Sequence, residues 1–339
     1  MIREVARLAG VSLGTVSRVI NGNATVATEL RERVERAISE LGYQPNVLAR
    51  GLRGGRTQSF GLVIPDVANP FFSAMVLDVE QAASRADYCV ILGNSVESPK
   101  AERLYIDLLL SRQVDGLLIT PTERTLSIDI PDRVPVVAVG RPLKGIPSVT
   151  TDERQGAIQA VEYLLRLGHR NIACIAGPRP HAMAAERHRG YLNSAGPALR
   201  ASGLNIPERT RFGAFDYEHG YKAASELLAI RPRPTAIFAS SDRQAIGALR
   251  AAADAGLEVP RDLSIVGFDN ISVTTLMTPR LTTVAMAALG ERGVQTLLDI
   301  LAGKAVPAER QKLGTTLVVR ESCGPPALPP RTTAPNRRH

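Results

Sequence analysis

From residue 60 onward, short apolar runs alternate with longer segments whose apolar residues recur at helical spacing. Strands and helices that alternate in this way are typical of βαβ units, in which a parallel sheet is covered on both faces. The strands could form one large sheet, a barrel or two lobes, and periodicity does not choose among these. The predicted strands are residues 60–64, 89–92, 116–119, 136–139, 172–176, 236–239 and 264–268, and the predicted helices include 73–87, 99–113, 153–168, 220–231, 243–256 and 289–302.

The segment before this pattern has a different organisation. It has the length and spacing of three short helices, and the last of them stops at Gly42, a residue that often ends helices. Residues 45–57 are basic, rich in glycine and too short to bury a core of their own. We therefore expect a small helical domain and a linker ahead of the α/β body. The predicted helices are residues 2–9, 13–21 and 29–41.

Charge is distributed unevenly along the 339 residues, whose formal net charge is +8. Residues 1–58 contain nine arginines and five glutamates, and residues 320–339 contain four arginines and one glutamate. The part of the chain between them is therefore close to neutral. A basic N-terminal region is expected of a chain whose first domain meets phosphates.

Several locations and scaffolds are disfavoured by the sequence. The chain opens without a basic and then apolar signal segment, and no stretch approaches the roughly 18 uninterrupted apolar residues of a membrane helix. We therefore expect a cytoplasmic protein without a membrane partner. Cys89, Cys174 and Cys323 are scattered in or beside apolar runs, which predicts reduced, buried thiols rather than disulfides or a metal site.

Enzyme signatures are also missing. The sequence contains no phosphate loop, no dinucleotide fingerprint after a strand, no G-x-S-x-G elbow and no H-E-x-x-H motif. Its five histidines form no ligand pair, and His181 and His188 lie on a stretch that Pro197 breaks soon afterwards. We therefore predict no catalytic activity, no cofactor and no metal.

The first two predicted helices carry the spacing of a helix-turn-helix. That motif needs a small residue where the helices touch, a turn residue that tolerates positive φ, and an apolar residue that packs back, and Ala6, Gly10 and Val16 supply these. Ser12 is placed to cap the second helix. A helical hairpin that only packs on the body is the alternative. The residues left for a groove-facing surface are Leu13, Gly14, Thr15, Ser17 and Arg18.

The N-terminal run IREVARLAGVSLGTVSRVING, residues 2–22, together with LGYQPN at residues 41–46, closely resembles the lactose-repressor (LacI/GalR) family. The resemblance covers almost the whole chain. Further stretches that resemble the family are GLVIPD (61–66), NPFF (69–72), VDGLL (114–118), LGHRNI (167–172), IVGFD (265–269), LTTV (281–284) and VVRES (318–322).

The resemblance implies which residues contact operator DNA. Residues after the recognition-helix cap choose the bases, but Leu13 offers only apolar contact and Gly14 offers no side chain, so hydrogen-bonded reading should depend mainly on Arg18. Leu52 matches a hinge leucine that enters the minor groove in relatives, although Gly51 stands where serine or alanine is usual. The full predicted DNA-binding set is Ser12, Leu13, Gly14, Thr15, Ser17, Arg18, Asn21, Asn46 and Leu52.

A second site is expected beyond the carboxyl ends of the strands, where open α/β sheets bind ligands. Acidic residues directly follow several strands, and the resemblance adds aromatic residues and an arginine from a cleft between two lobes. Each carboxylate could instead be a helix cap or a loop ion pair. Such a cleft suits a polyhydroxylated molecule such as a sugar. The predicted effector-binding residues are Asp66, Asn69, Phe71, Phe72, Asp152, Arg187, Phe215, Asp242 and Asp269.

The resemblance also implies the domain organisation and the mechanism. It predicts a helix-turn-helix head (1–45), a hinge (46–58), and a periplasmic-binding-protein-like core of two doubly wound parallel-sheet lobes (59–322), with lobe crossovers near residues 160, 283 and 312. Residues 323–339 are predicted to be a disordered tail. The expected function is a homodimeric repressor that binds pseudo-palindromic operator DNA under control of a small-molecule effector. A sugar-binding protein without a role on DNA is the alternative.

Overall fold

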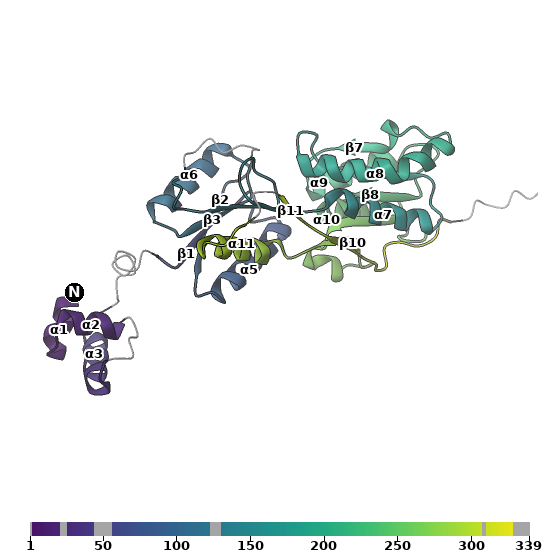
Figure 1. Cartoon of the computed structure of the whole chain (residues 1–339). Helices are drawn as coiled ribbons and strands as arrows, with labels where there is room; N and C mark the ends of the chain where they lie inside the picture. The colour runs from purple at the N-terminus through teal and green to yellow at the C-terminus, as the bar shows by residue number, and fades with distance from the viewer. Residues whose placement is uncertain (1, 21–25, 44–55, 123–129, 307–309, 328–339) are drawn as a thin grey trace, which may run out of the picture.

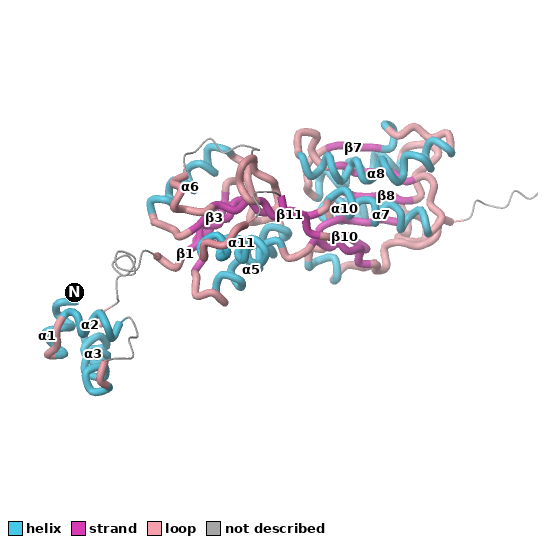
Figure 2. Tube along the Cα trace, in the orientation of Figure 1, coloured by secondary structure: helices cyan, strands magenta, loops and turns pink. Residues whose placement is uncertain are grey.

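The computed structural model describes residues 2–20, 26–43, 56–122, 130–306 and 310–327. It contains an N-terminal helical head and two α/β lobes (Figure 1). Each lobe holds one six-stranded sheet, and helices cover both faces of each sheet (Figure 2). The predicted α/β architecture with two doubly wound lobes is confirmed.

The head consists of α1 (Ile2–Ala9), α2 (Leu13–Ile20) and α3 (Thr28–Glu40). Their apolar faces meet in a small core in which Val5, Val16 and Val34 are fully buried. Gly42 has a φ of +56°, the left-handed conformation that ends many helices. The three predicted helices are therefore present with bounds that differ by one residue at most.

The first lobe is an all-parallel sheet in the order β11-β5-β4-β3-β1-β2. Helices α5 and α11 cover one face, where their apolar residues pack on Phe60 and Leu62, and α6 covers the other face beside Val63. The strands are β1 (Ser59–Ile64), β2 (Cys89–Asn94), β3 (Gly116–Ile119), β4 (Val136–Val139), β5 (Ser148–Thr151) and β11 (Arg310–Leu313), and the helices are α5 (Pro70–Ser84), α6 (Pro99–Ser111) and α11 (Leu289–Leu301).

The second lobe repeats this design in the order β12-β10-β9-β8-β6-β7, in which only the edge strand β12 is antiparallel to its neighbour. Helices α7 and α8 pack on one face and α9 and α10 on the other. The strands are β6 (Ile172–Ala176), β7 (Thr210–Phe212), β8 (Ala236–Ala239), β9 (Ser264–Asp269), β10 (Thr282–Met286) and β12 (Thr315–Val318), and the helices are α7 (Glu153–Arg166), α8 (Ala182–Ala201), α9 (Tyr217–Leu228) and α10 (Asp242–Asp254).

The sequence pattern missed five strands and one helix. Strands β5, β7, β10, β11 and β12 are short and rich in threonine or charge, so they lack the apolar run that identifies a buried strand. Helix α8 continues through Pro197, where we predicted a break. Because Ala195 and Leu199 are fully buried on either side, packing outweighs the hydrogen bond that proline cannot donate.

The chain passes between the lobes three times, as the resemblance implied. The passages lie at Asp152, at residues 287–288 and at Gly314, so the last two are close to the expected positions near 283 and 312, and the first comes earlier than the expected position near 160. The body also extends beyond Ser322, because the carbonyl of Gly324 accepts a hydrogen bond from the ring of His169 at 2.9 Å. Of the chain that the structure describes, no helix combines the length and the apolar character needed to cross a membrane.

The cysteine prediction is wrong at one position. Cys174 is buried in β6 and Cys323 is partly buried, but Cys89 is exposed at the start of β2. Because β2 is the edge strand of its sheet, one side of this strand has no neighbour to cover it.

Candidate DNA-binding and effector-binding sites

The helix-turn-helix has the local geometry that its spacing predicted. Gly10 adopts a φ of +61°, and the amide of Val11 donates to the carbonyl of Ala6 at 3.0 Å, so the chain reverses tightly between α1 and α2. Val16 is fully buried where α2 packs back on the head. Arg33 from α3 donates to the Gly10 carbonyl at 3.4 Å, which ties the turn to the third helix.

The outward face of α2 carries the side chains predicted to read DNA. The Ser12 hydroxyl accepts a hydrogen bond from the amide of Thr15 at 3.1 Å, as expected of an N-cap. Leu13, Gly14 and Arg18 are exposed, and Thr15 and Ser17 are partly exposed. Three further members of the predicted set, Asn21, Asn46 and Leu52, lie outside the described residues.

A cavity of about 760 Å³ lies between the two lobes. Its wall is formed by residues that follow β1 to β4 in the first lobe and β6 to β9 in the second lobe. Both sheets therefore present the carboxyl ends of their parallel strands to one cleft, where open α/β sheets bind ligands. The volume falls within the roughly 300–1,000 Å³ that is usual for small-molecule sites.

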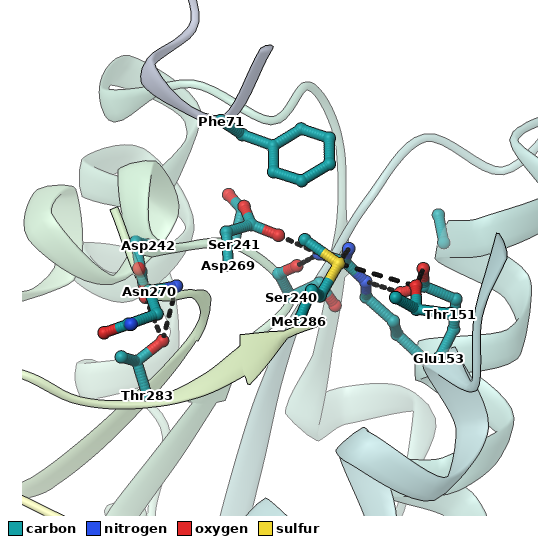
Figure 3. Close-up of polar contacts among 12 residues, drawn as sticks. Phe71, Thr151, Glu153, Ser240, Ser241, Asp242, Asp269, Asn270, Thr283 and Met286 are labelled. Atoms are coloured by element: carbon teal, nitrogen blue, oxygen red, sulfur yellow. Dashed lines mark hydrogen bonds and ion pairs between the residues drawn. The ribbon is translucent and has the colours of Figure 1, made fainter. Parts of the chain in front are cut away.

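Arg187 on α8 is the centre of a buried polar network in this cleft. Figure 3 labels its partners Glu153, Ser240 and Asp269. Its Nε donates to Glu153 at 2.6 Å, and its Nη1 donates to Asp269 at 2.9 Å and to the carbonyl of Ser240. The guanidinium also stacks 3.8 Å above the ring of Phe268. Only 4% of the Arg187 side chain is exposed, so its orientation is set by these contacts.

Asp269 ends β9 in an unusual backbone conformation. Its φ is +110° and that of Asn270 is +56°, both in a region that few non-glycine residues adopt. Burial raises the pKa of Asp269 to about 6; the charge of Glu153 adds to this effect, whereas that of Arg187 opposes it. Phe71 from the first lobe and Asp269 from the second lobe both line the cavity, and Figure 3 labels the two side chains.

Two further ion pairs line the cleft. Arg141 donates to both carboxylate oxygens of Glu97, at 2.6 and 2.8 Å, within the first lobe. Although burial alone would raise the pKa of Glu97, the Arg141 hydrogen bonds and charge lower it overall. Arg243 of α10 lies 3.6 Å from Asp66, so this pair joins the second lobe to the first.

Comparison with known proteins places this geometry in a family. Residues 1–46 match the family described as bacterial regulatory proteins, lacI family, and residues 161–323 match a periplasmic binding protein-like domain. The HTH-type transcriptional repressor CytR of Escherichia coli (strain K12) is 35% identical over 329 residues, which cover 95% of each chain. The chain belongs to the lacI family of bacterial regulatory proteins.

Solved structures agree with this assignment. The lac repressor dimer bound to operator and an anti-inducer has a TM-score of 0.80 at 29% identity, with 96% of this chain and 99% of that chain covered. The complex of the transcriptional regulator CelR with cellobiose has a TM-score of 0.66 at 35% identity, with 95% and 99% covered. This lacI-family protein is therefore a DNA-binding transcription regulator, as its sequence predicted.

Most of the effector-binding residues predicted for this lacI-family regulator line its cleft. Their contact with an effector remains a prediction. Asn69 also caps α5, because its side chain accepts a hydrogen bond from the amide of Phe71 at 3.2 Å. The cavity-lining members of the predicted set are Asp66, Asn69, Phe71, Phe72, Arg187, Phe215 and Asp269.

Two predicted effector residues do not line the cavity. Asp152 caps α7 through the amide of Gln155 and pairs with Lys312 at 3.2 Å. Asp242 is fully buried at the start of α10, where it accepts hydrogen bonds from the Thr283 hydroxyl and from the amide of Ile271. Both carboxylates thus have the capping or structural role that was the alternative, and Asp242 supports the loop after Asp269.

Sequence reasoning missed several cleft residues, among them Glu97, Thr122, Arg141, His181 and Arg243. Arg141 follows the apolar run of β4 after a single glycine, so the rule used for the aspartates could have found it. Glu97 was hidden because the predicted strand stopped at residue 92, whereas β2 continues to Asn94. Burial lowers the pKa of His181 to about 4, and the charges of Arg141 and Arg187 add to this effect, so its ring is neutral near pH 7.

Proposed function

We propose that the protein is a repressor that binds pseudo-palindromic operator DNA as a homodimer, under control of a sugar-like effector bound between its lobes. The observation that carries this proposal is the inter-lobe cavity with Arg187 and Asp269 at one wall and Phe71 at the other. Aromatic faces and hydrogen-bonding charged groups together suit a molecule that is apolar on its faces and hydroxylated at its edges.

The head supplies the contact with DNA. The exposed face of α2 fits a major groove, and Arg18, in the last turn of this helix, is a side chain that can form two hydrogen bonds to a guanine. One small head contacts few bases, so a two-fold pair that reads two half-sites increases both affinity and specificity. Because operator DNA lies in the cytoplasm, the proposal also places the protein there.

A second copy of the chain has an apolar surface to occupy. Leu104 and Leu108 are exposed one helical turn apart on α6, and Ile91 is exposed on the adjacent edge strand β2. In the second lobe Leu276 is 83% exposed. Apolar groups gathered at a sheet edge are typical of an interface, and the related lac repressor structure is a dimer. In analytical ultracentrifugation, the dimer of a Leu104→Lys variant should therefore dissociate into monomers at a higher protein concentration than the wild-type dimer does.

Control by the effector follows from the three passages between the lobes. A ligand that contacts both walls of the cleft binds one lobe arrangement better than another, and it shifts the population by that difference in affinity. The first described residues after the head, Arg56 and Thr57, bond to the first lobe through Leu301 and Asp115. Movement of that lobe therefore changes where the linker to the head begins.

The test is a titration of the full chain against a DNA pool with randomised half-sites at two salt concentrations. We expect sequence-selective binding that weakens steeply with salt, and a loss of at least about 1 kcal/mol for Arg18→Ala and for Leu52→Ala. Arg85→Ala, which breaks a surface ion pair with Glu291, is the matched control. If DNA binding is not sequence-selective and neither Arg18→Ala nor Leu52→Ala weakens it, the operator-binding role is refuted.

The effector class is tested by thermal shift. A panel of neutral sugars should contain compounds that raise the melting temperature of the protein, and Asp269→Asn should reduce that shift. A protein that responds to purines and to no sugar would contradict the proposed effector. We assign no catalytic activity, since the relatives identified by sequence are regulators.

A further inference from the structure

Each of the described arginines that line the cleft is paired with a carboxylate, although the buried Nε atoms of Arg141 and Arg243 have no hydrogen-bond partner. Hydrogen bonds to a carboxylate use the planar donors that a guanidinium would otherwise offer to a phosphate or to an acidic ligand. Arg141 is the clearest case, because its two terminal nitrogens donate to the two oxygens of Glu97. The three sets are Arg187 with Glu153 and Asp269, Arg141 with Glu97, and Arg243 with Asp66.

Four helices begin at the cleft wall, and a free helix N-terminus favours an anion. In each of these helices a side chain of the protein already accepts a hydrogen bond from a first-turn amide. The caps are Asn69 on α5, His181 on α8, Asp216 on α9 and Ser241 on α10, which accept from the amides of Phe71, Ala184, His219 and Gln244.

Among the residues that the structure describes, the charges around the cavity are unbalanced in the acidic direction. Four described carboxylates line it, one more lies behind Arg187, and the described guanidiniums at the cavity are three. His181 adds no positive charge near pH 7, because burial holds its pKa near 4. An anionic ligand would therefore meet repulsion from these carboxylates, whereas a hydroxyl group can donate to those that line the cavity. The five carboxylates belong to Asp66, Glu97, Glu153, Asp216 and Asp269.

We infer that the cleft selects an uncharged polyol, and that Glu97 is the residue that excludes phosphorylated and carboxylated sugars. The inference rests on the proposed function and specifies its effector. Arg141 is the cleft arginine that is paired with a single carboxylate through two hydrogen bonds, so Glu97 alone decides whether its charge is available.

The backbone supports this role of Glu97. Val96 and Glu97 have φ values of +50° and +53°, a conformation that is costly for a β-branched residue such as valine. Such strain persists where the surrounding contacts enforce it and is common at ligand sites. Here the turn lies after β2, and it carries the carboxylate to Arg141, which follows β4.

The experiment compares neutral sugars with their own phosphate esters, for example ribose with ribose 5-phosphate and glucose with glucose 6-phosphate. Binding is measured by calorimetry for the wild type, for Glu97→Gln and for the control Glu291→Gln, which frees the surface residue Arg85. In the wild type, we expect a neutral sugar that binds to do so at least about tenfold more tightly than its ester. Glu97→Gln should reduce that ratio at least about fivefold by releasing Arg141, and the control should not change it.

The outcomes separate this inference from the proposed function. A wild type that binds an ester as tightly as the neutral sugar overturns the inference, yet it leaves a sugar-controlled regulator in place. A ratio unchanged by Glu97→Gln, in a variant that melts as the wild type does, overturns the role of Glu97. If no sugar and no ester binds, the sugar effector is overturned and the inference falls with it. The wild-type comparison decides the matter even if the variant does not fold.

Discussion

The head and the cleft differ in the sequence distance over which they are assembled. In the head, Ser12 caps an amide three residues away, and Arg33 reaches Gly10 across 23 residues. In the cleft, Arg187 bonds to groups 34 and 82 residues away. The head is thus specified by local spacing, whereas the cleft exists only once two sheets have formed and faced each other. Changes in one region should therefore leave the other largely intact.

The largest effect should come from Arg187→Met. Removal of the guanidinium leaves Glu153 and Asp269 buried without a counter-charge, so the free energy of unfolding should fall by about 3–5 kcal/mol. Chemical denaturation measures this fall. Arg85→Met, at an exposed ion pair, should cost less than about 1 kcal/mol. A small loss for Arg187→Met would mean that the cleft tolerates its unpaired acids.

The next effect concerns pH. Since the pKa of Asp269 is raised to about 6, the folded protein binds a proton between about pH 4 and pH 6 that the unfolded chain has released. The contribution of this group to stability is therefore present at low pH and lost as the pH rises through 6. The Asp269→Asn variant lacks this titratable group and therefore this contribution, and asparagine tolerates the positive φ of this position. The stability difference between wild type and variant should change by on the order of 2 kcal/mol from pH 4 to 7. A constant difference would contradict the raised pKa.

The third effect concerns the DNA-binding head. Arg18→Ala should weaken operator binding by about 1–3 kcal/mol and relax base preference at one position of each half-site. The thermal shift caused by an effector should stay at its wild-type value, because the cleft is assembled without the head. Arg36→Ala, another exposed arginine of the head, should leave the base preference unchanged. If the Arg18→Ala variant keeps the base preference of the wild type, Arg18 does not read a base.

The smallest effect is expected at the cap of α2. Ser12→Ala removes the acceptor for the Thr15 amide and should cost the head about 0.5–1 kcal/mol. Hydrogen exchange of the α1 and α2 amides should report the loss, whereas the amides of both lobes keep their protection. Ser39→Ala on the exposed face of α3 is the control. Equal exchange in the two variants would show that the cap is not needed.

The sequence predicted what depends on short-range periodicity. The three head helices, seven of the core strands and most core helices were found, since each has an apolar pattern of its own. Thr-rich β5 and charged β11 were missed because they are strands only through their partners in the sheet. The resemblance to the lactose-repressor family supplied the two lobes, between which periodicity could not choose.

The candidate sites divide in the same way. Helix spacing alone placed Gly10 in a left-handed turn and Ser12 at a cap, because both roles are decided within one or two helical turns. The rule that polar residues follow strands found Asp66 and Asp269, but it could not separate them from Asp242, which follows a strand equally well and is buried under the loop.

The amino-acid sequence by itself thus determined the helical head, the α/β class of the body and the family. Those properties depend on residue spacing within single elements and on motifs along the chain. Only the tertiary structure decided which charges meet: Arg141 with Glu97, and Arg187 with Glu153 and Asp269. The reason is physical, since a partner 44 or 82 residues away is chosen by sheet order and lobe packing. The balance of charge in the cleft, and with it the kind of effector we infer, follows from those pairings.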